Sequence, residues 1–411
     1  METYTEVTDV GIEPKEGGLT SAKGFHAGGV HCGFKRKRPD LGWIYSDAPA
    51  NTAAVYTTNQ FQAAPLQVTK ESIAQEKRIQ GVLINSAVAN ACTGEEGLQN
   101  AYQMRRWFAE KLGIQPHLVA VNSTGVIGEQ LPMDTLAAGI EQINLHDTDE
   151  KNFERAILTT DTFTKNVCVQ VQIGEEQITI GGSAKGSGMI EPNMATMLAF
   201  LTTDAAIEQE SLDAALKTAV NKTFNCITVD GDTSTNDTVM VMANGMATNT
   251  PITSRDLNQC RVFTEALTYV CRELAKQIAR DGEGATKLIE VNVTGAQLQS
   301  DARAIGKAIV GSSLVKTAIY GSDPNWGRII CAIGYSGVAL DTCNLEVAIG
   351  DVKVVENGMP AAFADGVVTE YLRYNEQIVI TVNLHSGTQS ASAWGCDLSY
   401  DYVKINASYR T

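Results

Sequence analysis

Apolar residues along the chain recur with two periods, which predict alternating helices and strands. From Leu98 to Leu112 they return every three or four positions, the spacing of one helix face, and Gly113 follows as a helix-ending residue. The stretch from Leu257 to Ala279 repeats this pattern over a longer helix. Short apolar runs bounded by polar turns predict buried strands at Arg78–Asn85, Leu118–Asn122, Thr238–Met242, Lys287–Thr294 and Ile378–Leu384.

The clearest local structure is a hairpin, in which Asn166–Ile173 and Gln177–Ile180 alternate polar and apolar residues around Gly174. The first seventy residues predict only short strands and turns, such as Leu41–Tyr45 and Ala53–Thr57. Further helices are predicted at Met133–Ile143, Asp149–Leu158, Ser211–Lys222, Ser300–Val310 and Gly366–Tyr374. This mixture indicates an α/β protein, and 411 residues suffice for two or three core units.

Composition and charge narrow the class of protein. Apolar residues make up 44% and charged residues 19%, which is typical of a globular protein. The net charge of −15 argues against a nucleic-acid partner. The only basic cluster, Lys35–Arg38, is followed at once by Pro39 and Asp40, and we interpret it as a solvated turn.

The first ten residues carry Glu2, Glu6 and Asp9 and lack the apolar core of a signal peptide. No apolar run is long enough to span a membrane. The nine cysteines are scattered, odd in number and without a Cys-x-x-Cys pair, so we expect reduced and mostly buried thiols. These features predict a cytoplasmic protein without a membrane partner.

One stretch, Lys185–Phe200, joins a glycine-containing loop to an apolar run, and Thr196 lies at the junction. A threonine hydroxyl needs a base to become a good nucleophile. If the bond between Ala195 and Thr196 were cut, the new α-amino group, with a reference pKa of roughly 7.7–8, could serve as that base. From local features alone, an ordinary loop-to-strand junction remains the alternative.

Other loops contain residues that could take part in catalysis or binding, and for each of them an ordinary structural role is the alternative. Thr124 and Gly125 follow a buried strand, where backbone N–H groups could stabilise an oxyanion or merely form a turn. Lys185 lies in a glycine-containing loop without a phosphate-binding or dinucleotide motif, so it could be a surface lysine. Glu283 stands between two glycines after a helix. The acidic run Thr228–Thr238 lacks the spacing of a calcium loop, and we expect a hydrogen-bonded loop near the site.

The stretch ending in Met194-Ala-Thr-Met-Leu198 resembles the autoprocessing site of the ornithine acetyltransferase (glutamate N-acetyltransferase) family of arginine biosynthesis. This family implies stacked β-sheets sandwiched between helix layers, as in N-terminal-nucleophile proteins, with a smaller C-terminal α/β domain. Further matching blocks, in order along the chain, are Asn122–Glu129, Thr159–Thr162, Thr228–Asp237, Asp281–Lys287, Gly321–Arg328 and Tyr402–Asn406.

The resemblance also implies a role for individual residues. Thr196 would be the nucleophile, exposed by cleavage after Ala195, and Thr124 with Gly125 would form the oxyanion hole. The α chain (residues 1–195) and the β chain (residues 196–411) would share a core and assemble as an α2β2 heterotetramer. The implied substrate-binding residues are Thr159, Lys185, Thr196, Glu283, Asn406 and Thr411.

The implied reaction moves an acetyl group from N-acetylornithine to glutamate through an acetyl-threonine intermediate, with neither a cofactor nor a metal. Some members also accept acetyl-CoA as a donor, and these residues do not decide whether this chain does. Two alternatives stay open. A related self-cleaving aminopeptidase or amide hydrolase would give the acyl group to water, and a non-catalytic metabolite-binding protein would show no cleavage.

Overall fold

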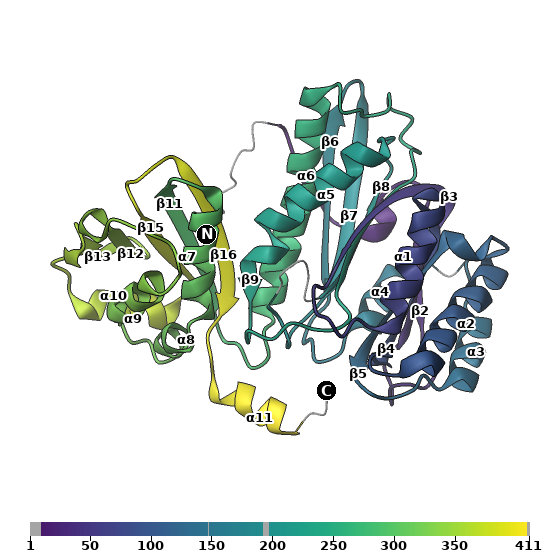
Figure 1. The fold of residues 1–411 in the computed structure, drawn as a ribbon, viewed down its shortest axis with the longest axis horizontal. Coiled ribbons are helices and arrows are strands. Elements are labelled where there is room, and N and C mark those ends of the chain that lie inside the picture. Colours follow the sequence, from purple (N-terminus) through teal and green to yellow (C-terminus); the bar gives the residue numbers. More distant parts are fainter. Residues whose placement is uncertain (1–9, 147, 192–196, 409–411) are drawn as a thin grey trace.

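The computed structural model describes residues 10–146, 148–191 and 197–408, and within them two sheets carry the fold (Figure 1). The nine-stranded sheet has the order β1-β6-β7-β8-β10-β3-β4-β5, with β2 paired to β3. Its strands are β1 (Glu13–Lys15), β2 (Phe25–Val30), β3 (Leu41–Tyr56), β4 (Arg78–Val88), β5 (Val119–Val126), β6 (Lys165–Ile173), β7 (Glu176–Lys185), β8 (Leu198–Thr203) and β10 (Thr238–Ala243).

This sheet forms two layers because β3 is long and irregular. The register between β3 and β4 shifts between Tyr45 and Ala50, so the first part of β3 pairs with β2 and β4 while its second part pairs with β10. Ile44 and Val82 from one layer and Phe200 from the other belong to one buried cluster. The two layers therefore stack face to face.

Helices cover the outer faces of both layers. On the β4–β5 side lie α1 (Ala64–Glu76), α2 (Gly94–Leu112) and α3 (Met133–Gln142). On the β6–β7 side lie α5 (Gln209–Lys222) and α6 (Leu257–Arg280). The helix α4 (Glu150–Ile157) instead packs on β2 and β3 and adds Phe153 and Ile157 to the cluster between the layers. The expected sandwich of two sheets between helix layers is confirmed.

The second, seven-stranded sheet has the order β14-β13-β12-β15-β11-β16-β9 and forms the expected smaller α/β unit (Figure 1). Its strands are β9 (Ile227–Thr228), β11 (Leu288–Ala296), β12 (Glu346–Ile349), β13 (Val352–Glu356), β14 (Met359–Pro360), β15 (Gln377–Asn383) and β16 (Gln389–Cys396). Helices α7 (Gln299–Gly311), α8 (Ser313–Tyr320), α9 (Trp326–Gly334) and α10 (Asp365–Tyr374) belong to this part, and α11 (Tyr400–Ser408) follows.

The interpretation of the first seventy residues is wrong in two respects. Leu41–Tyr45 and Ala53–Thr57 lie on one strand, since the polar residues between them occupy its irregular segment instead of ending it. The helix α1 begins at Ala64, with Pro65 at its first turn. The hairpin of β6 and β7 and the helix end at Gly113 are confirmed.

Two interpretations of side-chain exposure also need correction. All nine cysteines are free, but only Cys168, Cys226, Cys271 and Cys396 are buried, while Cys92, Cys331 and Cys343 are exposed. Lys35 is partly buried, because its Nζ donates to the Leu158 carbonyl at 2.6 Å. In the described part of the chain, no helix combines the length and apolar character needed to cross a membrane.

Candidate active site

A cavity of about 210 Å³ lies where loops from both halves of the chain meet the ends of strands in the first sheet. Met197, the first described residue after position 196, is part of its wall. The predicted positions Ala195, Thr196 and Thr411 lie outside the described residues. The remaining predicted site residues all line this cavity, namely Thr124, Gly125, Thr159, Lys185, Glu283 and Asn406.

Gly125, near the end of β5, has a backbone conformation that side chains other than glycine resist. Its φ is 131°, and a Cβ atom there would lie 2.2 Å from the carbonyl carbon of Ala87. The side-chain amide of Asn236 donates to the carbonyl oxygens of Ser123 at 2.8 Å and Ala89 at 2.7 Å. The backbone at Thr124 and Gly125 is therefore firmly held at the cavity wall, as an oxyanion hole requires.

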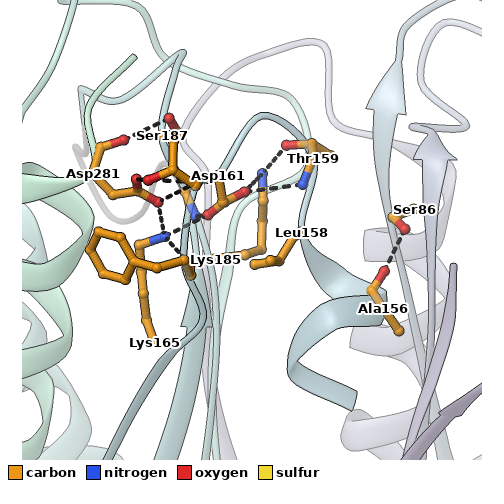
Figure 2. A network of polar contacts seen from close by, with 12 residues as sticks. Ser86, Ala156, Leu158, Thr159, Asp161, Lys165, Lys185, Ser187 and Asp281 are labelled. Atoms are coloured by element: carbon orange, nitrogen blue, oxygen red, sulfur yellow. Dashed lines mark hydrogen bonds and ion pairs between the residues drawn. The ribbon is translucent and has the colours of Figure 1, made fainter. Parts of the chain in front are cut away.

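Lys185, the last residue of β7, is buried, with 7% of its surface exposed, so the surface-lysine alternative is wrong. Its Nζ donates a hydrogen bond to Thr159 Oγ1 at 2.8 Å and lies 3.9 Å from Asp161 Oδ2 (Figure 2). A buried lysine at a cavity wall is a point charge that can pair with a ligand carboxylate.

A buried cluster of charges surrounds this lysine (Figure 2). Lys165 Nζ lies 2.7 Å from Asp161 Oδ1 and 2.6 Å from Asp281 Oδ2, and Asp161 also accepts the Gly186 N–H at 2.7 Å. Burial by itself would raise the pKa of Asp161, but the charges of Lys165 and Lys185 and these hydrogen bonds hold it well below its ordinary value. Asp161 is thus a permanent anion that fixes the segment carrying Lys185.

The tail of the chain reaches the cavity through α11. Asn406 Nδ2 donates to Glu283 Oε2 at 2.8 Å, and Tyr402 also lines the cavity. Gly188 packs against Glu283 so closely that a Cβ atom would lie 2.4 Å from its carboxyl carbon. The tail therefore docks at the cavity as expected, but no residue of α11 is buried, so polar contacts such as that between Asn406 and Glu283 hold the helix.

The acidic loop that raised the metal alternative is a hydrogen-bonded loop at the cavity, as expected. Asp230 accepts the N–H groups of Met189 at 2.6 Å and Ile190 at 2.8 Å, and that of Asp232 at 3.2 Å. Among the described residues, no group of three or more His, Cys, Asp or Glu side chains is arranged to hold a metal ion. Asp230 instead ties this loop to the segment that precedes position 192.

Asp237 has an unusual environment in the cavity wall. It is buried, and its Oδ2 has no hydrogen-bond partner within the described ranges. Burial raises the pKa of Asp237 well above its ordinary value, and the charge of Lys185 offsets this only in part. Because Thr238 pairs with Leu198 in parallel register, Asp237 lies beside Met197.

Sequence reasoning missed several residues that build this site. Asp161 and Asp281 lie within motifs that carried the resemblance, so the sequence could have drawn attention to them. It did not show that both carboxylates pair with Lys165. Lys165 begins a strand and has no local motif.

Burial, together with the carboxylates of Asp230 and Glu283, raises the pKa of Tyr402 to about 12, so its hydroxyl stays protonated.

These groups suit an amino acid as ligand. Lys185 offers a cation for a carboxylate, and Glu283 offers an anion for an ammonium group. The turn at Thr124 and Gly125 lies on the same cavity and can face a carbonyl that is under attack. The arrangement therefore has the groups needed to bind a zwitterion and to stabilise a developing negative charge.

Comparison with known proteins identifies the family. The model of the ArgJ family matches residues 26–411. The chain belongs to the ArgJ family. The arginine biosynthesis bifunctional protein ArgJ of Oceanobacillus iheyensis is 55% identical over 411 residues, which is 100% of both chains. The protein of the same name from Bacillus subtilis is 54% identical over 395 residues, covering 96% of this chain and 97% of the relative.

Two solved structures are similar to parts of this chain. The crystal structure of ArgJ from Bacillus halodurans is 54% identical with a TM-score of 0.50, and it covers 51% of this chain and 98% of its own. Ornithine acetyltransferase from Mycobacterium tuberculosis, solved with ornithine, is 34% identical with a TM-score of 0.41, covering 45% of this chain and 100% of that one. The resemblance inferred from the motifs is confirmed.

Proposed function

We propose that this ArgJ-family protein cleaves itself between Ala195 and Thr196 and then transfers acetyl groups from N2-acetyl-L-ornithine to L-glutamate. Membership of the family makes the chain an acetyltransferase of arginine biosynthesis, since its full-length relatives are named for that pathway. The observation that carries the proposal is that Lys185, Glu283 and the Thr124–Gly125 turn line the same cavity as Met197, the residue that follows Thr196 in the sequence.

Self-cleavage would begin with attack of Thr196 Oγ on the carbonyl carbon of Ala195. The peptide C–N bond breaks, the threonine nitrogen becomes a free amine, and water hydrolyses the resulting ester to leave a carboxylate on Ala195. The solved Bacillus halodurans chain supports such a cut, because nearly all of it aligns to only 51% of this chain. Each of the two predicted products, residues 1–195 and residues 196–411, also makes up about half of this chain.

Acetyl transfer would use the same hydroxyl. Neutral Thr196 amine takes the proton from Oγ, which attacks the acetyl carbonyl of N-acetylornithine, and the oxyanion is stabilised at Thr124 and Gly125. Collapse of this intermediate releases ornithine, with the proton passed to its leaving nitrogen, and leaves acetyl-threonine. The amine of glutamate then attacks the ester and carries the acetyl group away.

Substrate binding in this scheme rests on opposite charges. Lys185, with Thr159 as its hydrogen-bond partner, would pair with the α-carboxylate that both amino acids carry. Glu283, oriented by Asn406, would pair with an ammonium group, and Thr411 would also bind the substrate. One cavity thus binds ornithine and glutamate in turn, which predicts double-displacement kinetics.

The acetyl donors, the assembly and the location of the protein are part of the same proposal. The relatives are named bifunctional, and we extend that to this chain, with acetyl-CoA as a second acetyl donor and no metal or other cofactor. The two products of cleavage stay together as an α2β2 heterotetramer in the cytoplasm. β8, which follows the cut, pairs with β7 from before it, so the two products share one sheet.

Intact-mass measurement of the purified wild type beside Thr196→Ala tests the proposal. Two fragments that divide before residue 196 in the wild type, with the variant left whole, are the expected result. Acetyl transfer is then followed with and without glutamate. An uncut wild type, or deacetylation of N-acetylornithine at the same rate without glutamate, would overturn cleavage or transfer respectively.

A further inference from the structure

A second cavity, of about 520 Å³, lies where the helices that cover the first sheet meet the smaller α/β unit. Its walls come from α5, α6, α7 and β16, which lie next to one another at the centre of Figure 1. None of its lining residues also lines the first cavity. The proposed acetyl transfer therefore leaves this cavity without a role.

The charge of the second cavity is opposite to that of the whole protein. Lys222, Arg272 and Arg303 line it, and none of the described lining residues is an aspartate or glutamate, although the chain has a net charge of −15. Arg272 Nε lies 3.4 Å from the carboxylate of Glu273, which is outside the lining. Among the described residues, neither Lys222 nor Arg303 forms an ion pair with a carboxylate, so the cavity favours anions.

Two of these cations are held in place. Arg303 Nη1 donates to the Asn221 carbonyl at 3.3 Å, which fixes the side chain against the end of α5. The guanidinium of Arg272 lies over the ring of Tyr269, 5.2 Å from its centroid. Cations that are already oriented lose less conformational entropy when they bind a ligand.

Neutral donors add to this preference. Trp394 is 3% exposed, and its Nε1–H has no acceptor within the described residues. A buried donor without a partner typically costs about 1–3 kcal/mol, and a ligand oxygen would remove that cost. The helix α7 begins at Gln299 without a side-chain cap, so its first N–H groups add positive potential beside Ser300.

We propose that this second cavity binds a small polyanion carrying phosphate or carboxylate groups. Its volume lies within the roughly 300–1,000 Å³ typical of small-molecule sites. Lys222, Arg303, an indole N–H that has no acceptor among the described residues, and a helix N-terminus match a ligand with at least two anionic groups. The proposal is independent of the acetyl-transfer reaction, because the two cavities share no residue.

Calorimetric titration of the purified full-length protein at low ionic strength tests it, with pyrophosphate and citrate as separate probes. Saturable binding of at least one probe is expected, and either Arg303→Gln or Lys222→Gln should weaken it by at least about tenfold. Arg255→Gln changes an exposed arginine outside both cavities and should leave it unchanged. Binding of pyrophosphate alone assigns a phosphate ligand, and binding of citrate alone assigns a polycarboxylate.

The proposal is overturned if neither probe shows saturable binding. It is also overturned if Lys185→Gln abolishes binding while Arg303→Gln and Lys222→Gln keep it, since the anion would then occupy the first cavity. If the Arg303→Gln chain does not fold, Lys222→Gln decides the test, because Lys222 is exposed.

Discussion

Asp161 and Lys165 form an ion pair of 2.7 Å in which neither side chain is exposed to solvent. The second partner of Lys165, Asp281, comes from the end of α6, far away in sequence. Because Asp161 also receives the Gly186 N–H, this pair connects the protein core to the segment that follows Lys185. The buried charges thus have a positional role that their local sequence does not reveal.

Asp161→Asn should destabilise the protein by about 3–5 kcal/mol, because it removes one partner from a buried ion pair. Urea unfolding in the Thr196→Ala background measures this on a single chain. Since the pKa of Asp161 is depressed, its contribution is complete above its unfolded value near about 3.9 and is lost as the pH falls below it. Asp351→Asn, at an exposed position, should cost less than about 0.5 kcal/mol, and equal losses would contradict the assigned role.

Gly125→Ala should stop self-cleavage and lower the rate of transfer by about 100-fold or more, since its Cβ atom would collide with Ala87 and move an oxyanion donor. Gly128→Ala is the matched control. Gly128 also has a positive φ, of 83°, but a Cβ atom there meets nothing within 4 Å. Mass spectrometry and an acetyl-transfer assay compare the two, and similar activity in both variants would exclude the turn from catalysis.

Glu283→Gln should raise the KM for N-acetylornithine by about tenfold or more and change kcat much less, because a charged partner for the side-chain ammonium of this substrate is lost. The glutamine retains the shape that packs against Gly188. Initial-rate kinetics on the processed enzyme measure both constants. Glu175→Gln, in the exposed hairpin turn, serves as the control, and an unaltered KM in the Glu283 variant would place the ammonium elsewhere.

Asp237→Asn should make stability less dependent on pH. The folded pKa of Asp237 is raised, so the wild type loses stability as the pH rises from the unfolded value toward the folded one. The slope from this group is at most about 1.4 kcal/mol per pH unit. Unfolding at pH 5 and pH 8 in the Thr196→Ala background should show a smaller loss in the asparagine variant, and identical losses would mean that Asp237 ionises normally.

Removal of the last six residues should impair substrate use more than folding. The helix α11 has no buried residue, so we expect the free energy of unfolding to change by less than about 0.5 kcal/mol. The loss of Asn406 leaves Glu283 without its hydrogen-bond donor, which should raise KM. Full activity in the truncated enzyme would show that the tail does not contact the substrate.

Much of the site could be anticipated because its residues lie in blocks of sequence that resemble one known family. Thr124, Gly125, Lys185 and Glu283 were named from that resemblance, whereas their local motifs left ordinary structural roles open, and all four line one cavity. The state of Asp237 could not be anticipated, because an aspartate in a polar run gives no sign of burial. Lys165 was missed because one of the carboxylates that it pairs with, that of Asp281, comes from a distant part of the chain.

The sequence by itself determined most of the helices, the hairpin and the order of the motifs, because each depends on the spacing of neighbouring residues. Tertiary structure alone decided that β3 spans two layers and that Asp161 and Asp281 share Lys165. It also decided that Asn406 reaches Glu283, 123 positions earlier in the chain. Such contacts depend on how the whole chain packs, and local periodicity contains no information about which distant side chains will share a buried, low-dielectric space.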